Sequence, residues 1–260
     1  MDSIKLILAI IFLPVFAKCE RFIYKGDTSY FFEKSPLEQY PLIEQLRPQL
    51  SGYQSGPCFD CYMRPYDAEW TVIDDYLYLT GIYGADFSKT SMKADINKLF
   101  HVIDGKVKAT WVTTDIWVPV GKAIYSYDNM QSIYRNELLF TVENGKIIKI
   151  EKSPTSVVSI YDTDNEALRK FICTHIDWNK IPDLKNEVKK IFLQFEHGIS
   201  GRPENIRVLL GSDSLYNAET LRVTGILPWS ILYLHGKIFR GIWTIPIVFS
   251  EANRKFGTEP

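Results

Sequence analysis

The chain has 260 residues, of which 46% are hydrophobic and 23% are charged, and its formal net charge at pH 7 is −1. This composition predicts a globular protein of one large or two modest domains with a real hydrophobic core. A net charge near zero gives no attraction to nucleic acid or to an anionic membrane, so we expect no nucleic-acid partner. The 15 Tyr, 15 Phe and 6 Trp favour β-sheet.

The first 17 residues are typical of an export signal. Lys5 gives a short basic start, and an unbroken apolar run follows from Leu6 to Ala17. A run of about a dozen residues fits a signal-peptide core and is too short to span a bilayer. Val15 and Ala17 suit a cleavage site, so we place the cut after Ala17 and expect a periplasmic or secreted protein.

Cys19 leaves a second interpretation open, a lipoprotein acylated at this cysteine. Lipoprotein signals have a small residue directly before the cysteine, where this chain has Lys18, so simple cleavage is favoured. Membrane association is then expected only if the N-terminus is retained as an anchor or Cys19 is lipidated. No later segment has the roughly 18 uninterrupted apolar residues of a membrane helix.

Residues 18–56 are interpreted as an extended entry segment lying against the first domain. Prolines limit a helical pattern at residues 37–46 to a short helix. From residue 69 onward apolar residues recur at every second position, which predicts β-strands on both sides of a turn at Asp74-Asp75. Short β-rich stretches follow at residues 106–112, 115–118 and 122–127.

A hairpin is the clearest local prediction. Asn144-Gly145 suits the two positive-φ positions of a type I′ turn, and residues 137–143 and 146–151 alternate as its arms. Residues 57–155 are therefore expected to form a mostly antiparallel β domain. This region is similar to uncharacterised β-rich modules of exported bacterial proteins, at Trp111 and at residues 117–122, and the likeness implies no activity.

A linking helix is expected within residues 156–176. Thr163 and Glu166 have the spacing of a capping box, with Thr163 as the N-cap. Apolar residues continue on one face to about Ile176, where the helix is expected to end.

The last third of the chain has the predicted order strand, strand, helix, strand. The strands lie at residues 188–196, 205–210 and 238–249, and the helix at residues 215–224. The helix has cap candidates at residues 212–214 and is expected to stop at Gly225 and Pro228, with Leu221 on its apolar side. Glu219 and Arg222 form an i,i+3 pair on its outer side.

This order of elements and the sequence motifs within them resemble the C-terminal domain of the TonB family over about residues 175–252. We therefore place a TonB-like domain at residues 177–252 and a tail at 253–260. The positions that carry the resemblance are Pro182, Phe195, Gly201, Ile206, Val208, Asn217, Glu219, Leu221, Arg222, Pro228, Trp229, Gly236, Lys237, Pro246 and Phe249. The resemblance implies binding of a protein or extended peptide, with an outer-membrane receptor among the partners.

A TonB-type energy transducer is an alternative, with the N-terminal segment retained in the membrane. Such a transducer has an uncleaved membrane helix and a long Pro-rich spacer, where this chain has a cleavable signal and a β domain. We therefore favour an exported, non-enzymatic binding protein of a cell envelope.

The resemblance implies that an extended peptide adds as a strand to a sheet edge, and the last strand is the predicted edge. Pro246 has no N–H, which suits an edge position, and it could equally serve to blunt that edge against aggregation. The predicted binding residues are Trp243, Thr244, Ile245, Ile247, Val248 and Phe249.

Cys58 and Cys61 form a C-x-x-C motif, which is a structural disulfide, a redox pair or half of a metal site. The motif lacks the βαβ context of a thioredoxin and has no second pair of ligands for zinc. In an oxidising compartment the two would bridge each other, Cys19 or Cys173. A structural disulfide is favoured, and a thiol-redox protein remains an alternative.

The sequence shows no catalytic, nucleotide-binding or metal motif. We therefore predict no catalytic residue, no metal and no cofactor. The predicted fold class is α+β, with a β-rich antiparallel N-terminal domain followed by a small strand-strand-helix-strand domain.

Overall fold

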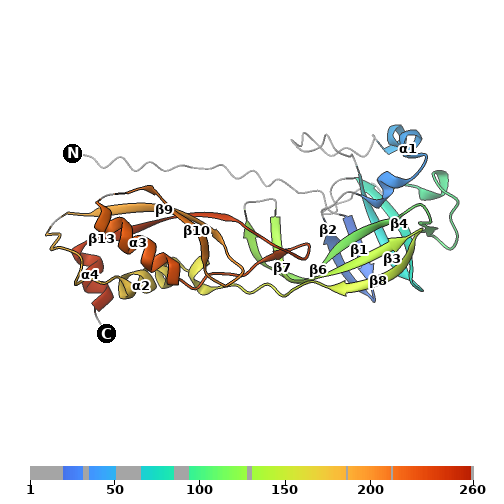
Figure 1. The fold of residues 1–260 in the computed structure, drawn as a ribbon. Helices are drawn as coiled ribbons and strands as arrows, with labels where there is room; N and C mark the ends of the chain where they lie inside the picture. The colour runs from blue at the N-terminus through green and yellow to red at the C-terminus, as the bar shows by residue number, and fades with distance from the viewer. Residues whose placement is uncertain are drawn as a thin grey trace. The chain divides into compact units, whose positions relative to one another are not determined.

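The computed structural model describes residues 20–31, 35–50, 66–84, 94–127, 131–185, 187–211 and 213–258 (Figure 1). It is a mixed α+β protein in which strands predominate and most strand pairs are antiparallel, so the predicted class is confirmed. The described helices include none that is both long and apolar enough to cross a bilayer. The chain divides into two compact units, each treated separately below.

The first unit comprises the described residues within Met1–Val118, Asp128–Gln131 and Phe140–Ile150. Its sheet has the order β2-β1-β3-β4-β8-β7-β6, and β5 pairs with β4. Strands β6, β7 and β8 contribute residues to both units. The bounds are β1 Glu20–Tyr24, β2 Asp27–Phe31, β3 Tyr66–Ile73, β4 Tyr76–Gly84, β5 Val107–Lys108, β6 Thr114–Tyr127, β7 Gln131–Glu143 and β8 Lys146–Lys152.

Both predicted turns of this sheet are confirmed. Asn144 and Gly145 have φ of 47° and 75° between β7 and β8, as a type I′ turn requires. Asp74 and Asp75 have φ of 48° and 59° between β3 and β4. Short polar residues tolerate this left-handed region, which explains why sequence alone located both turns.

The predicted extended entry segment is corrected. A tight turn at Lys25-Gly26 folds β1 and β2 into a hairpin, and β1 also pairs in parallel with β3. Residues 36–50 hold the 3₁₀-helix η1 (Pro36–Gln39) and helix α1 (Ile43–Leu50), in place of one short helix at 37–46. Residues 20–31 contain aromatic and β-branched residues, which favour a strand when a neighbouring strand is present. That neighbour is β3, which is distant in the sequence, so a local pattern does not reveal the pairing.

Two further strand predictions in the first half are corrected. The stretch at residues 106–112 keeps only the two residues of β5, and the stretches at 115–118 and 122–127 merge into the single strand β6. Gly121 has φ of 79° within β6, so the glycine accommodates an irregularity that does not end the strand.

Aromatic residues and the buried carboxylate of Glu20 lie in the core of the first unit. Phe22 and Phe140 are fully buried, and their ring centroids are 4.9 Å apart. The indole N–H of Trp70 donates to the carboxylate of Glu20, and both residues are fully buried. An apolar core that holds such a carboxylate keeps it hydrogen-bonded, because an unpaired buried charge is costly.

The second unit comprises Pro119–Tyr127, Ser132–Leu139 and the described residues within Glu151–Pro260. Its three-stranded antiparallel sheet has the order β10-β9-β13, and a two-stranded hairpin joins β11 to β12. The bounds are η4 Ile160–Asp162, α2 Asn165–His175, β9 Lys189–His197, β10 Pro203–Leu210, α3 Ser214–Ile226, β11 Tyr233–Leu234, β12 Lys237–Ile238, β13 Ile242–Phe249 and α4 Glu251–Thr258.

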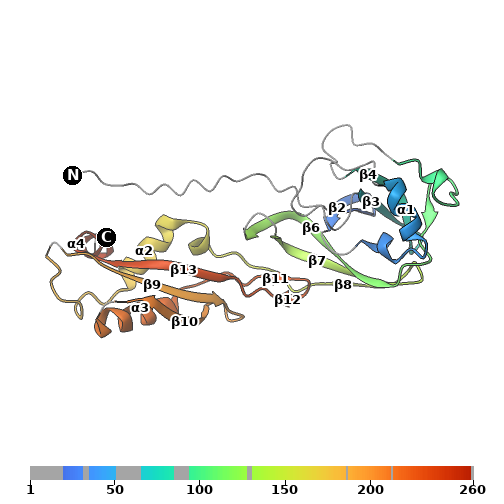
Figure 2. The ribbon, with the colours of Figure 1, turned by 90° about the horizontal axis from the view of Figure 1, so that it is seen from above.

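One face of this sheet carries the core of the second unit. Alternate residues of β9 and β13 are buried there against residues of α2 and α3. Figure 2 shows α3 beside β9 and β10, and α2 on the side of β13. The core residues are Ile172, Ile176, Trp178, Ile181, Leu184, Ile191, Leu193, Phe195, Tyr216, Val223, Leu227, Trp229, Ile245, Ile247 and Phe249.

The ends of α2 and α3 differ from the prediction. Asp164, and not Thr163, is the N-cap of α2, because its carboxylate accepts from the backbone N–H groups of Glu166 and Ala167. The Thr163 hydroxyl donates instead to the carbonyl of Ile160. The linking helix therefore occupies only residues 165–175 of the expected 156–176. Helix α3 continues through Gly225 to Ile226, since one glycine inside a packed helix costs only about 1 kcal/mol.

The end of the chain also differs from the prediction. The expected strand at 238–249 is two strands, β12 and β13, and the expected tail at 253–260 is largely the helix α4. The last turn of α4 lies against α2, with the Arg169 guanidinium 4.5 Å from the centre of the Phe256 ring. Packing on α2 stabilises a helix that is too short to form alone.

Candidate functional site

Strand β13 lies at one edge of the three-stranded sheet. It pairs in antiparallel register with β9 over its whole length, from Ile242 opposite Glu196 to Phe249 opposite Lys189. Among the described strands no other pairs with it. The edge beyond β13 is thus available to a further strand (Figure 2).

The register fixes which backbone groups of β13 face outward. Opposite residues of an antiparallel pair exchange either both hydrogen bonds or neither, in alternation. The His197 N–H donates to the Gly241 carbonyl at 3.3 Å, so Gly241 and every second residue after it bond to β9. The residues between them direct their backbone polar groups away from β9. These are Ile242, Thr244, Pro246 and Val248.

Pro246 occupies one of the outward positions. Its missing N–H therefore removes no bond to β9, which explains how a proline is accommodated in this strand. Ile242 and Thr244 keep both an N–H and a C=O on the outer edge, and Pro246 keeps its C=O.

Helix α4 closes the other end of this edge. The Asn253 side-chain amide donates to the Val248 carbonyl at 2.7 Å. Its oxygen accepts from Arg169 of α2, at 3.2 Å from Nε and 2.8 Å from the terminal nitrogen. Asn253 is buried and held from both sides, so the open edge ends before Val248.

A groove of about 670 Å³ runs beside the outer edge of β13. Its walls come from η4, α2 and β13, and residues from both faces of β13 contribute to them, so the groove follows the edge itself. The lining residues are Tyr161, Asp162, Asn165, Leu168, Arg169, Ile172, Cys173, Val188, Trp229, Trp243, Thr244, Ile245, Pro246, Val248, Ser250 and Asn253.

Trp243 is the second residue of β13, lines this groove and is fixed by His197. Its indole N–H donates to Nε2 of His197 at 2.9 Å. Because an indole can only donate, Nε2 is unprotonated, and the Nδ1–H donates to the Ser230 carbonyl at 3.1 Å. His197 is 0% exposed, and burial lowers its pKa more than the bond to Ser230 raises it. The imidazole is thus held neutral.

The second unit is expected to lose stability in mild acid. With the folded pKa of His197 lowered, the unfolded chain binds the proton first, so stability falls as the pH drops below the ordinary histidine value of about 6.5. The slope for one such group is at most about 1.4 kcal/mol per pH unit. Burial lowers the pKa of His235 in the same direction, so thermal unfolding between pH 5 and 8 should be compared for His197→Gln and His235→Gln. A His197→Gln profile identical to that of the wild type would contradict this assignment.

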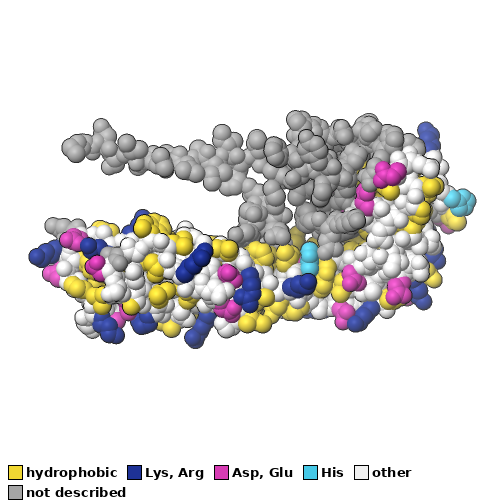
Figure 3. All heavy atoms as spheres, turned by 45° about the horizontal axis from the view of Figure 1, so that its top comes forward, with side chains coloured by type: hydrophobic (Ala, Val, Ile, Leu, Met, Phe, Trp, Pro, Cys, Tyr) yellow, Lys and Arg dark blue, Asp and Glu magenta, His cyan; other side chains and the backbone are white. Residues whose placement is uncertain are grey.

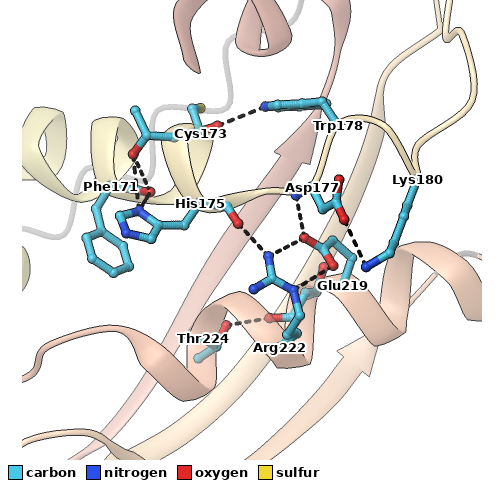
Figure 4. Close-up of polar contacts among 11 residues, drawn as sticks. Phe171, Cys173, His175, Asp177, Trp178, Lys180, Glu219, Arg222 and Thr224 are labelled. Atoms are coloured by element: carbon cyan, nitrogen blue, oxygen red, sulfur yellow. Dashed lines mark hydrogen bonds and ion pairs between the residues drawn. The ribbon is translucent and has the colours of Figure 1, made fainter. Parts of the chain in front are cut away.

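Glu219 and Arg222 form a clamp between α3 and the segment after α2 (Figure 4). The Glu219 carboxylate accepts from the Asp177 N–H at 2.7 Å and from two nitrogens of Arg222 at 2.6 and 2.9 Å. Arg222 also donates to the His175 carbonyl. The predicted i,i+3 pair is confirmed. Its place on the outside is right for Arg222, whose side chain is 44% exposed, and wrong for Glu219, which is only 6% exposed.

Other residues that carry the resemblance lie in turns, in helix α3 and in the segment after it. Gly236 has φ of 69° in the β11–β12 turn, and Asn217 lies half-buried in α3. Pro228 is exposed, and its carbonyl accepts from the Ser159 hydroxyl. Leu221 is 39% exposed, so its predicted place on the apolar side of the helix is wrong. Val223 and Thr224 fill that side instead.

The candidate disulfide residues Cys58 and Cys61, the signal segment, Cys19 and the cap candidate Ser212 lie outside the described residues. Cys173 is free and buried, and burial raises the pKa of its thiol. The part of the chain that the structure describes holds no cluster of potential metal ligands.

The structure brings together Trp243, Thr244, Ile245, Pro246 and Val248 along the groove, as the resemblance implies for an edge site. Ile245 belongs to both the core and the groove lining, whereas Ile247 and Phe249 belong to the core and do not line the groove. Asp162, Arg169, His197 and Asn253 were not among the predicted residues. No local pattern marks them, because their roles arise from contacts between distant segments.

Comparison with known proteins leaves the resemblance as a prediction: the chain matches no protein-family model, no curated protein and no solved structure.

Proposed function

We propose that this chain is an exported, non-enzymatic protein of a cell envelope whose C-terminal domain binds an extended segment of another protein. The bound segment adds as a strand to the outer edge of β13. In this proposal a β-rich N-terminal domain precedes a TonB-like domain, and the protein is periplasmic or secreted. An outer-membrane receptor is one partner that the family resemblance would imply.

The outer edge of β13 is the observation that carries the proposal. Ile242 and Thr244 present backbone donors and acceptors to a partner, and the groove beside them has room for its side chains. Strand addition gives affinity through backbone bonds and specificity through such pockets. Apart from the short strands β11 and β12, the elements β9, β10, α3 and β13 follow one another in the strand-strand-helix-strand order that the resemblance implies.

Charge does not offer an equally good explanation. On the face shown in Figure 3, basic and acidic side chains of the described residues are interspersed with hydrophobic ones. Such a face provides no single-sign field to attract a charged partner over long range. Backbone pairing needs no such field.

Replacing Thr244 by proline is expected to weaken peptide binding at least about tenfold, since an outward N–H is lost while pairing with β9 is retained. Thr244→Ala is the matched control, because it shortens the side chain and keeps the N–H. Acetylated heptapeptides of alternating Thr and Val serve as probes, with affinity measured by calorimetry and protection of β13 amides by hydrogen exchange. Equal affinities for the proline and alanine variants, or no protection of β13 in the wild type, would refute strand addition.

A further inference from the structure

Two buried polar groups of the groove have no hydrogen-bond partner among the described residues. One is the carboxylate of Asp162, at the end of η4, of which both oxygens are buried. The other is the indole N–H of Trp229, whose side chain is only 3% exposed. Both residues line the groove beside β13. Buried polar groups in folded proteins are almost always paired, so these two mark a place for a ligand.

The surroundings of Asp162 leave its charge uncompensated. Burial raises the pKa of the carboxyl above its ordinary value. The nearby Ser230 hydroxyl and the backbone N–H of Asp162 itself offset part of this increase, neither of them through a hydrogen bond of normal geometry. The basic side chain in the groove wall is Arg169, and it is already bound to Asn253 and placed over the Phe256 ring. A cation for Asp162 would therefore have to come from the ligand.

The remaining walls suit a long basic side chain. Leu168 and Ile172 of α2 and Trp243 of β13 provide apolar surface for its methylene groups. Alternate side chains of an added strand point to the same side, so every second residue of the segment can face this wall. The Trp229 N–H, which only donates, would bind a carbonyl oxygen of the same segment.

Resting on the proposed function, we propose that the segment bound along β13 carries a lysine or arginine whose side chain enters the groove and pairs with the Asp162 carboxylate. The site thus selects an extended basic peptide over an apolar or acidic one. A hydrogen bond between two charged groups in a partly dry groove is about twice as strong as a neutral one, which provides the discrimination.

The test uses Thr/Val heptapeptides that are identical except for a central Lys, Leu or Glu, titrated into the full mature chain by calorimetry. The Lys peptide is expected to bind about tenfold more tightly than the Leu peptide, and the Glu peptide most weakly. Asp162→Asn should reduce the preference for Lys over Leu to less than about twofold while β13 amides remain protected by both peptides. Glu166→Gln, at an exposed carboxylate of α2, removes the same charge outside the groove and should keep the preference.

The outcomes separate the two proposals. If all peptides protect the β13 amides with equal affinity in the wild type, strand addition stands and the basic pocket is refuted. If the preference survives in Asp162→Asn, another group selects the cation and the assignment is refuted. If no peptide protects β13, both proposals fail. If the Asp162→Asn protein does not fold, the order of affinities of the wild type for the Lys, Leu and Glu peptides decides the question alone.

Discussion

Replacing Glu219 by alanine is expected to lower the free energy of unfolding of the second unit by about 2–3 kcal/mol. The substitution leaves the Asp177 N–H without its acceptor and frees the Arg222 guanidinium. Arg222 is half exposed and can be hydrated, so the loss stays at the lower end for a broken buried pair. Urea denaturation followed by hydrogen exchange of second-unit peptides measures the effect.

Two variants sharpen this test. Glu219→Gln keeps an acceptor for Asp177 but removes the charge that Arg222 binds, so its effect should lie between alanine and the wild type. Glu187→Gln removes an exposed ion pair with Lys189 in the same unit and should change nothing measurable. A Glu219→Ala protein as stable as Glu187→Gln would show that the clamp does not hold the segment after α2.

The same carboxylate contributes to the acid sensitivity of this unit. Burial acts to raise the pKa of Glu219, but the hydrogen bonds from Arg222 and from the Asp177 amide outweigh it, and the net pKa is lowered. A carboxyl with a lowered folded pKa contributes stability above its unfolded value of about 4.3. That contribution disappears as the pH falls through the folded value.

Replacing Gly257 by alanine is expected to destabilise the second unit by about 2 kcal/mol, in spite of the better helix propensity of alanine. A Cβ at this position of α4 would lie 2.1 Å from the carbonyl oxygen of Cys173 and 2.6 Å from its carbonyl carbon. Both are backbone atoms of α2, so α4 would have to move away from α2. Thermal unfolding and hydrogen exchange of α4 report the change.

Gly225→Ala is the matched control for this substitution. Gly225 lies within α3, and a Cβ there would meet only Ile206 Cδ1 at 3.9 Å, an ordinary contact. It should stabilise the unit by about 0.5–1 kcal/mol, the propensity difference between glycine and alanine. Equal effects of the two substitutions would mean that α4 is not packed on α2 as described.

Local chemistry explains which parts of the fold the sequence predicts. Asn144-Gly145 and Asp74-Asp75 determine their turns through their own φ preferences, and the order of β9, β10, α3 and β13 follows from apolar periodicity. The β1–β2 hairpin and α4 are stabilised by partners far along the chain, β3 and α2. Periodicity within a short window contains no information about such partners.

The candidate site likewise has features that the sequence predicts and features that only the folded chain reveals. Pro246 indicates an edge strand without any structure, because a missing N–H has a fixed consequence in a sheet. Glu219 was identified as the partner of Arg222 but not as a buried acceptor for Asp177, a residue 42 positions away. No local pattern marks Asp162 as a site residue, and only folding brings it and Trp229 into the lining of one groove.

The hydrogen bond from Asn253 to the Val248 carbonyl limits the affinity of β13 for an added strand. With that carbonyl occupied, the outer edge offers a partner the N–H and C=O of Ile242 and Thr244 and the C=O of Pro246. Each backbone bond contributes a net 0.5–1.5 kcal/mol or so, which points to dissociation constants of roughly micromolar or weaker. Such a complex would exchange rapidly, and stable attachment would depend on tethering that keeps the partner at a high effective concentration.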